Sequence, residues 1–490
     1  WGGAMAEREQ DRAPTGLPRS QVIGLLLGAA FLLATLVLSP PQGMAPEAWS
    51  ALGLMLLMAT WWSTEAIPIP ATALLPIVLV PALGLGSISQ ATTPYANPII
   101  FLFLGGFTLG LAMQRWNLHR RIALATLRAM GSRPRRQIAG FMIATAFLSM
   151  WVSNTATAIM MLPIGLSVIG MTRDDNRDGV RRYATALLLA IAYAASIGGI
   201  ATLIGTPPNA LLAAYLSEEQ GVAVGFAQWM LLGVPVAGIM LALAWWWLTR
   251  KDFGLAGHTD SGDLIRRELA ELGPFSKAEA WVAGVFLVTA MAWILRPFLS
   301  AHLAPWLSDT GIAIAAAIAM FLIPVDVRKR QFLLDWDTAK GLPWGVLLLF
   351  GGGLAMAGVI SSSGLAEWIA GTLSVAGTLP TLLLIVLVAG VIVFLTEVTS
   401  NTATAAAFLP LLGALAESQG VSPVLLTVPA AIAASCAFMM PVATPPNAIV
   451  FSSGHMRIAD MIRAGLALNL MGIAVVTLLC YGLIALVFSL

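Results

Sequence analysis

Charged residues are scarce in this 490-residue sequence: Asp, Glu, Lys and Arg make up 10% of it, whereas hydrophobic residues make up 58%. It has four histidines and only two cysteines, Cys436 and Cys480, which both lie inside apolar runs. This shortage argues against a disulfide framework, a metal centre built on cysteine and an enzyme active site, and we expect no nucleic-acid partner. The mean hydropathy of +0.86 indicates a polytopic membrane protein surrounded by lipid.

Long apolar runs are what the sequence has instead. A run of about 20 residues crosses a hydrocarbon layer of ~30 Å. By this measure eleven spanning helices are predicted, at 21–38, 48–62, 66–85, 95–113, 184–216, 226–249, 279–297, 309–324, 343–360, 422–455 and 462–488. Two more apolar runs, 138–170 and 380–416, are each interrupted near the middle. Residues 1–20 form a polar tail, and its opening WGGA is interpreted as an expression scar.

Basic residues predict the orientation of the spans. If the spans alternate from a cytoplasmic N-terminus, 25 of the 26 Lys and Arg residues fall on the cytoplasmic side and only Arg296 falls outside. The polar linker 250–277 then lies in the cytoplasm, and its second part is predicted to form an amphipathic surface helix. We therefore expect an integral protein of a bacterial inner membrane with its N-terminus in the cytoplasm.

Two motifs occur twice and in the same order. SNTATA stands at 153–158 and at 400–405, and GTPPNA at 205–210 is matched by ATPPNA at 443–448. Five predicted spans separate the two interrupted runs, and because this number is odd the second copy enters from the opposite face. The chain is therefore predicted to contain two inverted repeats, 21–249 and 278–490, as in many secondary transporters.

The duplicated motifs predict four helix interruptions. Each SNTATA divides a run into two arms that are too short to span, which favours re-entrant hairpins at 138–170 and 380–416. Each Pro-Pro pair removes amide donors and breaks the helices at 184–216 and 422–455. Irregular backbone at membrane depth is tolerated only where it lines a cavity or is buried in protein, because lipid offers no hydrogen bonds.

The interruptions have the chemistry of an ion site. Amides at helix N-termini suit an anion, whereas free carbonyls and Asn oxygens suit a hard cation such as sodium. The hairpin tips and the Pro-Pro breaks contain no Lys or Arg, so an anionic substrate must be neutralised together with a cation. Glu397, three residues before the second Ser-Asn-Thr, is interpreted either as tuning this site or as a structural carboxylate.

With WWSTEAIPIPATALLP at 61–76, these motifs make the chain similar to the divalent anion/sodium symporter family. The resemblance extends over nearly all of the chain after residue 20. It implies an all-α homodimer in which a scaffold domain and a mobile transport domain work by an elevator movement. It also implies that at least two sodium ions bind.

The resemblance assigns residues to these sites by their position in the matching motifs. Ten residues would hold the substrate carboxylates: Ser153, Asn154, Thr155, Thr206, Pro207, Ser400, Asn401, Thr402, Thr444 and Pro445. The first sodium would be bound by Ser149, Ser153, Asn154 and Gly205. The second sodium would be bound by Thr396, Thr399, Asn401 and Ala443, partly through backbone carbonyls.

The favoured function is sodium-coupled uptake of a C4-dicarboxylate such as succinate, malate or fumarate, because two Ser-Asn-Thr tips provide one donor cluster for each carboxylate. A sodium-independent dicarboxylate exchanger remains an alternative, although a fixed basic side chain near a tip would be expected there. Citrate or sulfate as the substrate stays open as well. A membrane enzyme or a channel fits less well, since the spans contain no His and no acidic pair at helical spacing.

Overall fold

Helices account for most of the chain in a computed structural model, which describes residues 18–172, 176–255, 261–374 and 379–488. Eight of the described helices are long and apolar enough to cross a membrane. The prediction of a helical integral membrane protein is confirmed, whereas the number of eleven spans stays a prediction. Most of the predicted polar tail, residues 1–17 with the opening WGGA, lies outside the described residues.

The first half of the chain contains a succession of helices and ends before a linker helix. Its elements are α2 (Arg19–Val37), α3 (Pro46–Thr64), α4 (Ile69–Thr72), α5 (Leu75–Ala82), α6 (Ile88–Thr92), η1 (Thr93–Ala96), α7 (Pro98–Arg115), α8 (Leu118–Met130), α9 (Pro134–Ser149), α10 (Asn154–Met171), α11 (Arg177–Ile200), α12 (Pro207–Glu219) and α13 (Phe226–Thr249). The linker helix is α14 (Ser261–Glu271), which confirms the helix predicted there.

The second half repeats the pattern and adds a short hairpin of strands. Its helices are α15 (Lys277–His302), α16 (Asp309–Leu322), α17 (Trp336–Ala339), α18 (Trp344–Ser362), α19 (Leu365–Ser374), α20 (Thr381–Thr396), α21 (Asn401–Ser418), α22 (Val424–Ala434), α23 (Pro445–Phe451) and α24 (Ile458–Phe488). Strands β1 (Pro324–Asp326) and β2 (Gln331–Phe332) pair antiparallel, with Pro324 opposite Phe332.

The expectation of one continuous helix over 66–85 is wrong. The run forms the short helices α4 and α5, with Ala73 and Leu74 between them. Prolines explain the division, since Pro68 stands directly before α4 and Pro76 lies in the first turn of α5. Proline has no amide hydrogen, and its ring clashes with the preceding turn, so it starts helices and interrupts them.

The broken helix predicted at 184–216 begins earlier than expected. The first arm, α11, starts at Arg177, because the Asn176 side chain caps it and accepts a hydrogen bond from the amide of Gly179 at 2.9 Å. This first turn is polar and was not part of the apolar run. Helices α8 and α19 were not predicted either, since each is too short or too polar to stand out as a span.

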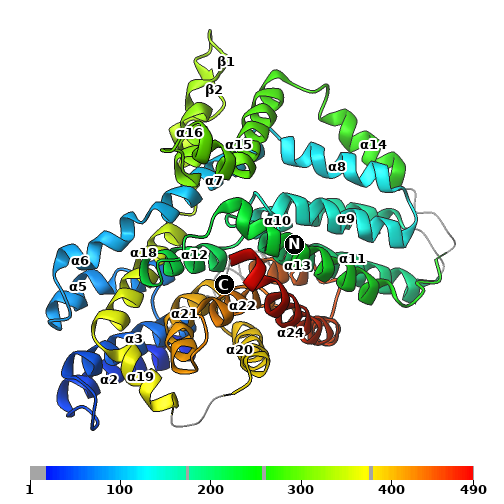
Figure 1. Cartoon of the computed structure of the whole chain (residues 1–490). Coiled ribbons are helices and arrows are strands. Elements are labelled where there is room, and N and C mark those ends of the chain that lie inside the picture. Colours follow the sequence, from blue (N-terminus) through cyan, green and yellow to red (C-terminus); the bar gives the residue numbers. More distant parts are fainter. Residues whose placement is uncertain (1–17, 173–175, 256–260, 375–378, 489–490) are drawn as a thin grey trace, which may run out of the picture.

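The four interruptions lie in one region of the molecule. Figure 1 shows α7, α15, α16 and the strands at the top, and α2, α3 and α19 at the lower left. Helices α9 to α12 run across the centre toward the right, and α20 to α22 lie below them. Helix α9 packs on α11, α20 packs on α22, and α11 is buried along almost its whole length.

Candidate functional site

The first interruption separates α9 from α10 at the SNTATA motif. Ser153 is the N-cap of α10, and its hydroxyl accepts a hydrogen bond from the amide of Ala156 at 3.3 Å. The buried Ser149 hydroxyl lies 2.6 Å from Asn154 Oδ1 and 2.6 Å from the carbonyl oxygen of Ala195. A hydroxyl has one hydrogen, so it can donate to only one of these two acceptors. The arrangement brings the oxygens of Ser149, Asn154 and Ala195 close together.

The Asn154 amide fits its surroundings better in its other orientation. Turned about its last bond, its nitrogen lies 2.6 Å from Ser149 Oγ, 3.1 Å from the Ala195 carbonyl oxygen and 3.2 Å from that of Gly205, and its two hydrogens are shared among these three acceptors. The oxygens of Ser149, Ala195 and Gly205 therefore face one point, which the amide nitrogen of Asn154 occupies in this orientation.

The second interruption separates α20 from α21 and has the same pattern. The buried Thr396 hydroxyl lies 2.7 Å from Asn401 Oδ1 and 3.0 Å from the carbonyl oxygen of Ala434. One hydrogen again faces two acceptors. The nearby Thr399 hydroxyl donates to the carbonyl of Leu395 or shares a hydrogen with Thr404 Oγ1 at 2.6 Å, so it ties the two arms of the interruption together.

The first Pro-Pro break lies between α11 and α12. The fully buried side-chain nitrogen of Asn209 lies 3.3, 3.3 and 2.9 Å from the carbonyl oxygens of Gly199, Ile200 and Thr202, and its two hydrogens are shared among them. Thr202 in turn donates through its hydroxyl to the carbonyl of Met150 at 2.6 Å. The asparagine of the TPPNA motif thus satisfies carbonyls that the break leaves free, and the break is joined to the first interruption.

The second Pro-Pro break, between α22 and α23, is longer than the first. Asn447 donates to the carbonyls of Ala437 and Met440 at 3.1 and 3.0 Å, which is the role that Asn209 has in the first break. The backbone amide of Asn447 donates to the hydroxyl of Thr444 at 3.3 Å, so Thr444 caps the start of α23. Both copies of TPPNA therefore use their asparagine in the same way.

The carboxylate of Glu397 accepts hydrogen bonds from the backbone amides of this second break. Its Oε1 accepts from the amides of Phe438 and Met439 at 2.7 and 2.9 Å, and from the side chain of Asn469 on α24 at 2.7 Å. Its Oε2 accepts from the amide of Met440 at 2.9 Å. The side chain is only 3% exposed, and these four partners are all donors. The structure thus supports the structural role that the sequence had left open for this carboxylate.

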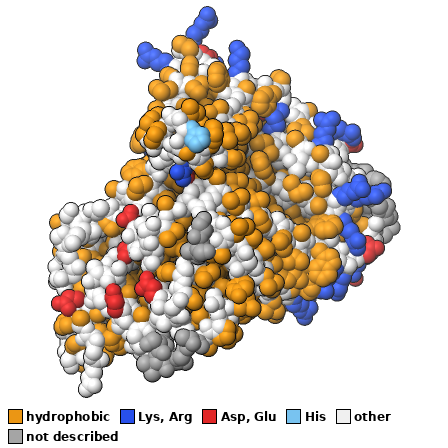
Figure 2. All heavy atoms as spheres, in the orientation of Figure 1, with side chains coloured by type: hydrophobic (Ala, Val, Ile, Leu, Met, Phe, Trp, Pro, Cys, Tyr) orange, Lys and Arg blue, Asp and Glu red, His pale blue; other side chains and the backbone are white. Residues whose placement is uncertain are grey.

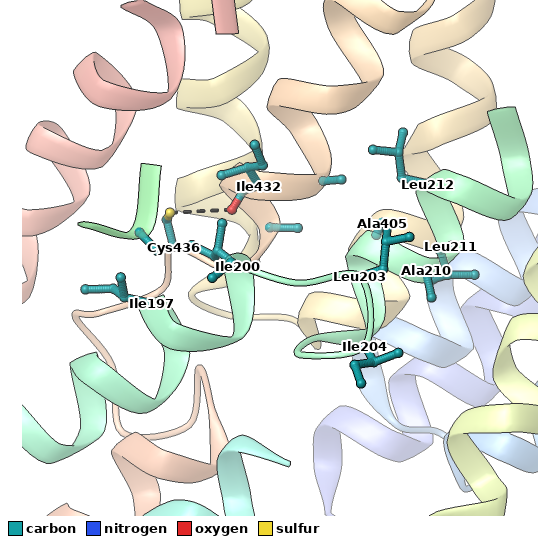
Figure 3. Packing of buried hydrophobic residues seen from close by; sticks show 14 of the residues in the cluster. Ile197, Ile200, Leu203, Ile204, Ala210, Leu211, Leu212, Ala405, Ile432 and Cys436 are labelled. Atoms are coloured by element: carbon teal, nitrogen blue, oxygen red, sulfur yellow. Dashed lines mark hydrogen bonds between the residues drawn. The ribbon is translucent and has the colours of Figure 1, made fainter. Parts of the chain in front are cut away.

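The two breaks meet in the middle of the molecule. The Thr206 hydroxyl of the first lies 3.4 Å from the Ser435 hydroxyl of the second. Figure 3 shows Ile197 and Ile200 of α11 near Cys436, and Leu211 of α12 near Ala405 of α21. Across the halves, α10 packs on α23 and α12 packs on α21. The helix that follows each SNTATA interruption is therefore in contact with the Pro-Pro break of the other half.

The predicted substrate residues differ in how accessible they are. Six of them are half-buried at the starts of α10 and α21: Ser153, Asn154, Thr155, Ser400, Asn401 and Thr402. Thr206 and Thr444 are buried, Pro207 is half-buried and Pro445 is exposed. A cavity of about 160 Å³ reaches Ser153 from between α7 and the turn at 341–343, with Gly110 and Gln114 on its wall.

Backbone groups make up the part of the site that the sequence did not reveal. The carbonyls of Ala195 and Ala434 and the hydroxyl of Ser435 were not predicted. The first two have no sequence signal, because every residue carries a carbonyl and only the fold decides which ones face inward. Among the described residues no group of three or more His, Cys, Asp or Glu could hold a metal.

Helices that are interrupted in pairs inside a membrane protein are typical of a class of secondary transporters. The chain belongs to the divalent anion/sodium symporter family, since the family model described as "Sodium:sulfate symporter transmembrane region" matches residues 19–489. A sodium-dependent dicarboxylate transporter, SdcS, of Staphylococcus saprophyticus is 44% identical over 477 residues, covering 95% of this chain and 91% of that protein. SdcS of Staphylococcus aureus strain bovine RF122 is 43% identical over 474 residues, covering 94% and 91%.

Solved structures share the fold at low sequence identity. The YdaH transporter of Alcanivorax borkumensis has a TM-score of 0.58 and 14% identity, over 96% of this chain and 99% of its own. MtrF of Neisseria gonorrhoeae has a TM-score of 0.57 and 11% identity, over 96% of each chain. Both likenesses concern the fold alone.

Proposed function

We propose that this protein carries C4-dicarboxylates such as succinate, malate and fumarate into the cytoplasm together with sodium. The observation that carries the proposal is the pair of equivalent oxygen clusters, made by Ser149, Asn154 and the Ala195 carbonyl in one half and by Thr396, Asn401 and the Ala434 carbonyl in the other. Relatives more than 40% identical over nearly the whole chain are named sodium-dependent dicarboxylate transporters, which supports the same substrate class and coupling ion.

Sodium suits the chemistry of both clusters. Each one gathers hydroxyl, amide and carbonyl oxygens, and neutral oxygens of this kind are suitable ligands for a hard cation. In the first half these would be Ser149, Asn154 and Gly205 with the carbonyl of Ala195, and Ser153 closes the tip. In the second half they would be Thr396 and Asn401 with the carbonyl of Ala434, and Thr399 and Ala443 complete the predicted set.

The dicarboxylate is proposed to lie between the starts of α10 and α21. The amides there face outward from a helix N-terminus, which favours negative charge by about 0.3–1 kcal/mol per terminus. Thr155 and Thr402, just inside the two helices, add hydroxyl donors. With no basic side chain in the interruptions, the sodium ions supply the remaining positive charge, so substrate binding depends on sodium.

An elevator movement is proposed for transport, with the hairpins and breaks moving together against the scaffold of a homodimer. Glycines allow the hairpins and breaks to approach the scaffold closely. A Cβ atom at Gly110 of α7 would lie 3.0 Å from the Trp151 carbonyl, and one at Gly353 of α18 would lie 3.2 Å from Ala406. Small residues leave few side chains that must be displaced when one surface slides over another.

Uptake of labelled succinate by proteoliposomes containing the purified protein tests the proposal. Uptake should depend on an inward sodium gradient and fall to background when choline replaces sodium. Equal rates in the two buffers would refute the coupling, and succinate counterflow that persists in choline would indicate the exchanger instead.

Sulfate is the second candidate, because the description of the matching family model names it. Thermal-shift measurements with succinate, citrate and sulfate, each as a sodium and as a potassium salt, separate the candidates. We expect stabilisation by succinate in sodium alone. Stabilisation by sulfate without any effect of succinate would refute succinate as the substrate and favour sulfate.

A further inference from the structure

A cavity unrelated to the interruptions lies where three long helices end together. It is bounded by the start of α11, the end of α13 with the residues that follow it, and the start of α24. Its volume of about 460 Å³ is within the range of small-ligand sites, roughly 300–1,000 Å³. Figure 2 shows Lys and Arg side chains gathered at this edge of the molecule, near the ends of α9 and α11.

The lining is strongly basic. Six basic and two acidic side chains surround the cavity: Arg181, Arg182, Arg250, Lys251, Arg457 and Arg463 with Asp178 and Asp460. Asp460 is the acidic partner of Arg457 at 3.2 Å and lies 3.8 Å from Arg181. Within the described part of the chain, Arg463 and Lys251 form no ion pair with an acidic side chain. The cavity therefore keeps an excess of positive charge.

Other features of the cavity favour an anion that carries an apolar tail. The first turns of α11 and α24 line it, so the positive ends of their dipoles lie close to it. Its floor is apolar, with Leu189 of α11 and Ala464 of α24. Arg250 lies 3.5 Å from the centre of the Trp247 ring, so its guanidinium is held at the rim.

Below the cavity the same helices expose an apolar surface. Trp246 and Ile239 on α13 are 52% and 43% exposed, and Leu466 and Leu470 on α24 are 40% and 54% exposed. Tryptophan at the end of a spanning helix is typical of the level of the lipid headgroups. An anion bound in the cavity can thus continue into acyl chains that lie along α13 and α24.

We propose that this cavity binds the phosphate of an anionic phospholipid. Arginine forks match the geometry of phosphate oxygens, and basic pockets between spanning helices are a known setting for such headgroups. The phosphate would be held by Arg463 and Lys251, with Arg181 and Arg182 next to it. Binding would link the end of α13 to the starts of α11 and α24. This proposal is independent of which anion the protein transports.

Native mass spectrometry and thermal unfolding of the full chain in detergent test the proposal. Phosphatidylglycerol is titrated against phosphatidylcholine, and sodium phosphate and glycerol phosphate serve as soluble arms at the same ionic strength. We expect saturable retention of phosphatidylglycerol and a rise in the unfolding midpoint. Since one basic residue near a headgroup contributes about fivefold in affinity, the double variant Arg463→Gln, Lys251→Gln should bind it roughly 25-fold more weakly.

Two further variants make the result specific. Arg463→Lys keeps the charge and should retain most of the binding, whereas Arg128→Gln removes an exposed arginine on α8, outside the cavity, and should bind like the parent protein. Equal retention of phosphatidylglycerol by the double variant and Arg128→Gln would overturn the proposal. Stabilisation by glycerol phosphate or inorganic phosphate that equals the lipid effect would overturn the lipid as the source of the phosphate.

Discussion

Replacing Glu397 by Gln should destabilise the second Pro-Pro break, whereas the helices around it should remain folded. In the parent protein the carboxylate accepts three amides of the break and the Asn469 side chain, from a position that is 3% exposed. Glutamine has one acceptor oxygen. With that oxygen at the Oε1 position it keeps three of the bonds, but its NH₂ group then faces the amide of Met440, donor against donor.

The size of the effect follows from these contacts. A hydrogen bond to a charged group contributes about 1.5–3 kcal/mol, and a buried donor left without a partner costs about 1–3 kcal/mol. Losing one bond and orphaning the Met440 amide gives a destabilisation of roughly 3–5 kcal/mol, since the three remaining bonds weaken as well. This is a large share of the total of about 5–15 kcal/mol that is usual for folded proteins.

Two measurements follow the change. The unfolding midpoint in detergent should fall by several degrees, and the sodium concentration for half-maximal uptake should rise at least threefold, because the Ala434 carbonyl at the edge of this break belongs to the proposed second sodium site. Glu417→Gln is the matched control, as it lies on α21, is exposed and accepts one bond of 3.3 Å from Gln220. If Glu397→Gln and Glu417→Gln gave the same midpoint and sodium dependence, the proposed role of Glu397 would be refuted.

Three further predictions concern the tips, the cavity beside them and a titrating side chain. Asn154→Ala and Asn401→Ala should each lower sodium-driven succinate uptake at least tenfold and abolish succinate stabilisation in thermal-shift assays; preserved stabilisation would contradict the proposed ligand roles. Gly110→Val should lower the maximal uptake rate, because its Cβ would lie 3.0 Å from the Trp151 carbonyl at the cavity, while sodium still raises the unfolding midpoint; an unchanged rate would exclude this surface from the movement. Burial lowers the pKa of His119 below its ordinary 6.5, so the unfolded chain takes up a proton first as the pH falls and stability is lost below about pH 6.5. His119→Gln should therefore show a smaller fall in midpoint between pH 7 and 5.5 than the parent protein, and identical falls would count against this residue.

Much of the fold could be predicted from local features of the sequence. Apolar runs indicated the long helices, and the duplicated motifs indicated where four of the runs are interrupted. These predictions depend on short-range physics: a proline has no amide hydrogen to donate, and a serine before a helix caps its first turn. The run 66–85 contains several prolines. Because each proline lacks an amide hydrogen, this run forms two short helices instead of one.

Local sequence was therefore enough to place the helix breaks and to show that they contain no basic side chain. Only the tertiary structure decided which groups meet there: the Ser149 and Thr396 hydroxyls with the carbonyls of Ala195 and Ala434, and Glu397 with the amides of a loop some forty residues away. The basic cavity at the ends of α11, α13 and α24 also arises only on folding, from segments far apart in the chain. The physical reason is that helix breaks are set by each residue and its neighbours, whereas contacts between backbone groups depend on how whole helices pack, and every residue carries the same carbonyl and, proline apart, the same amide.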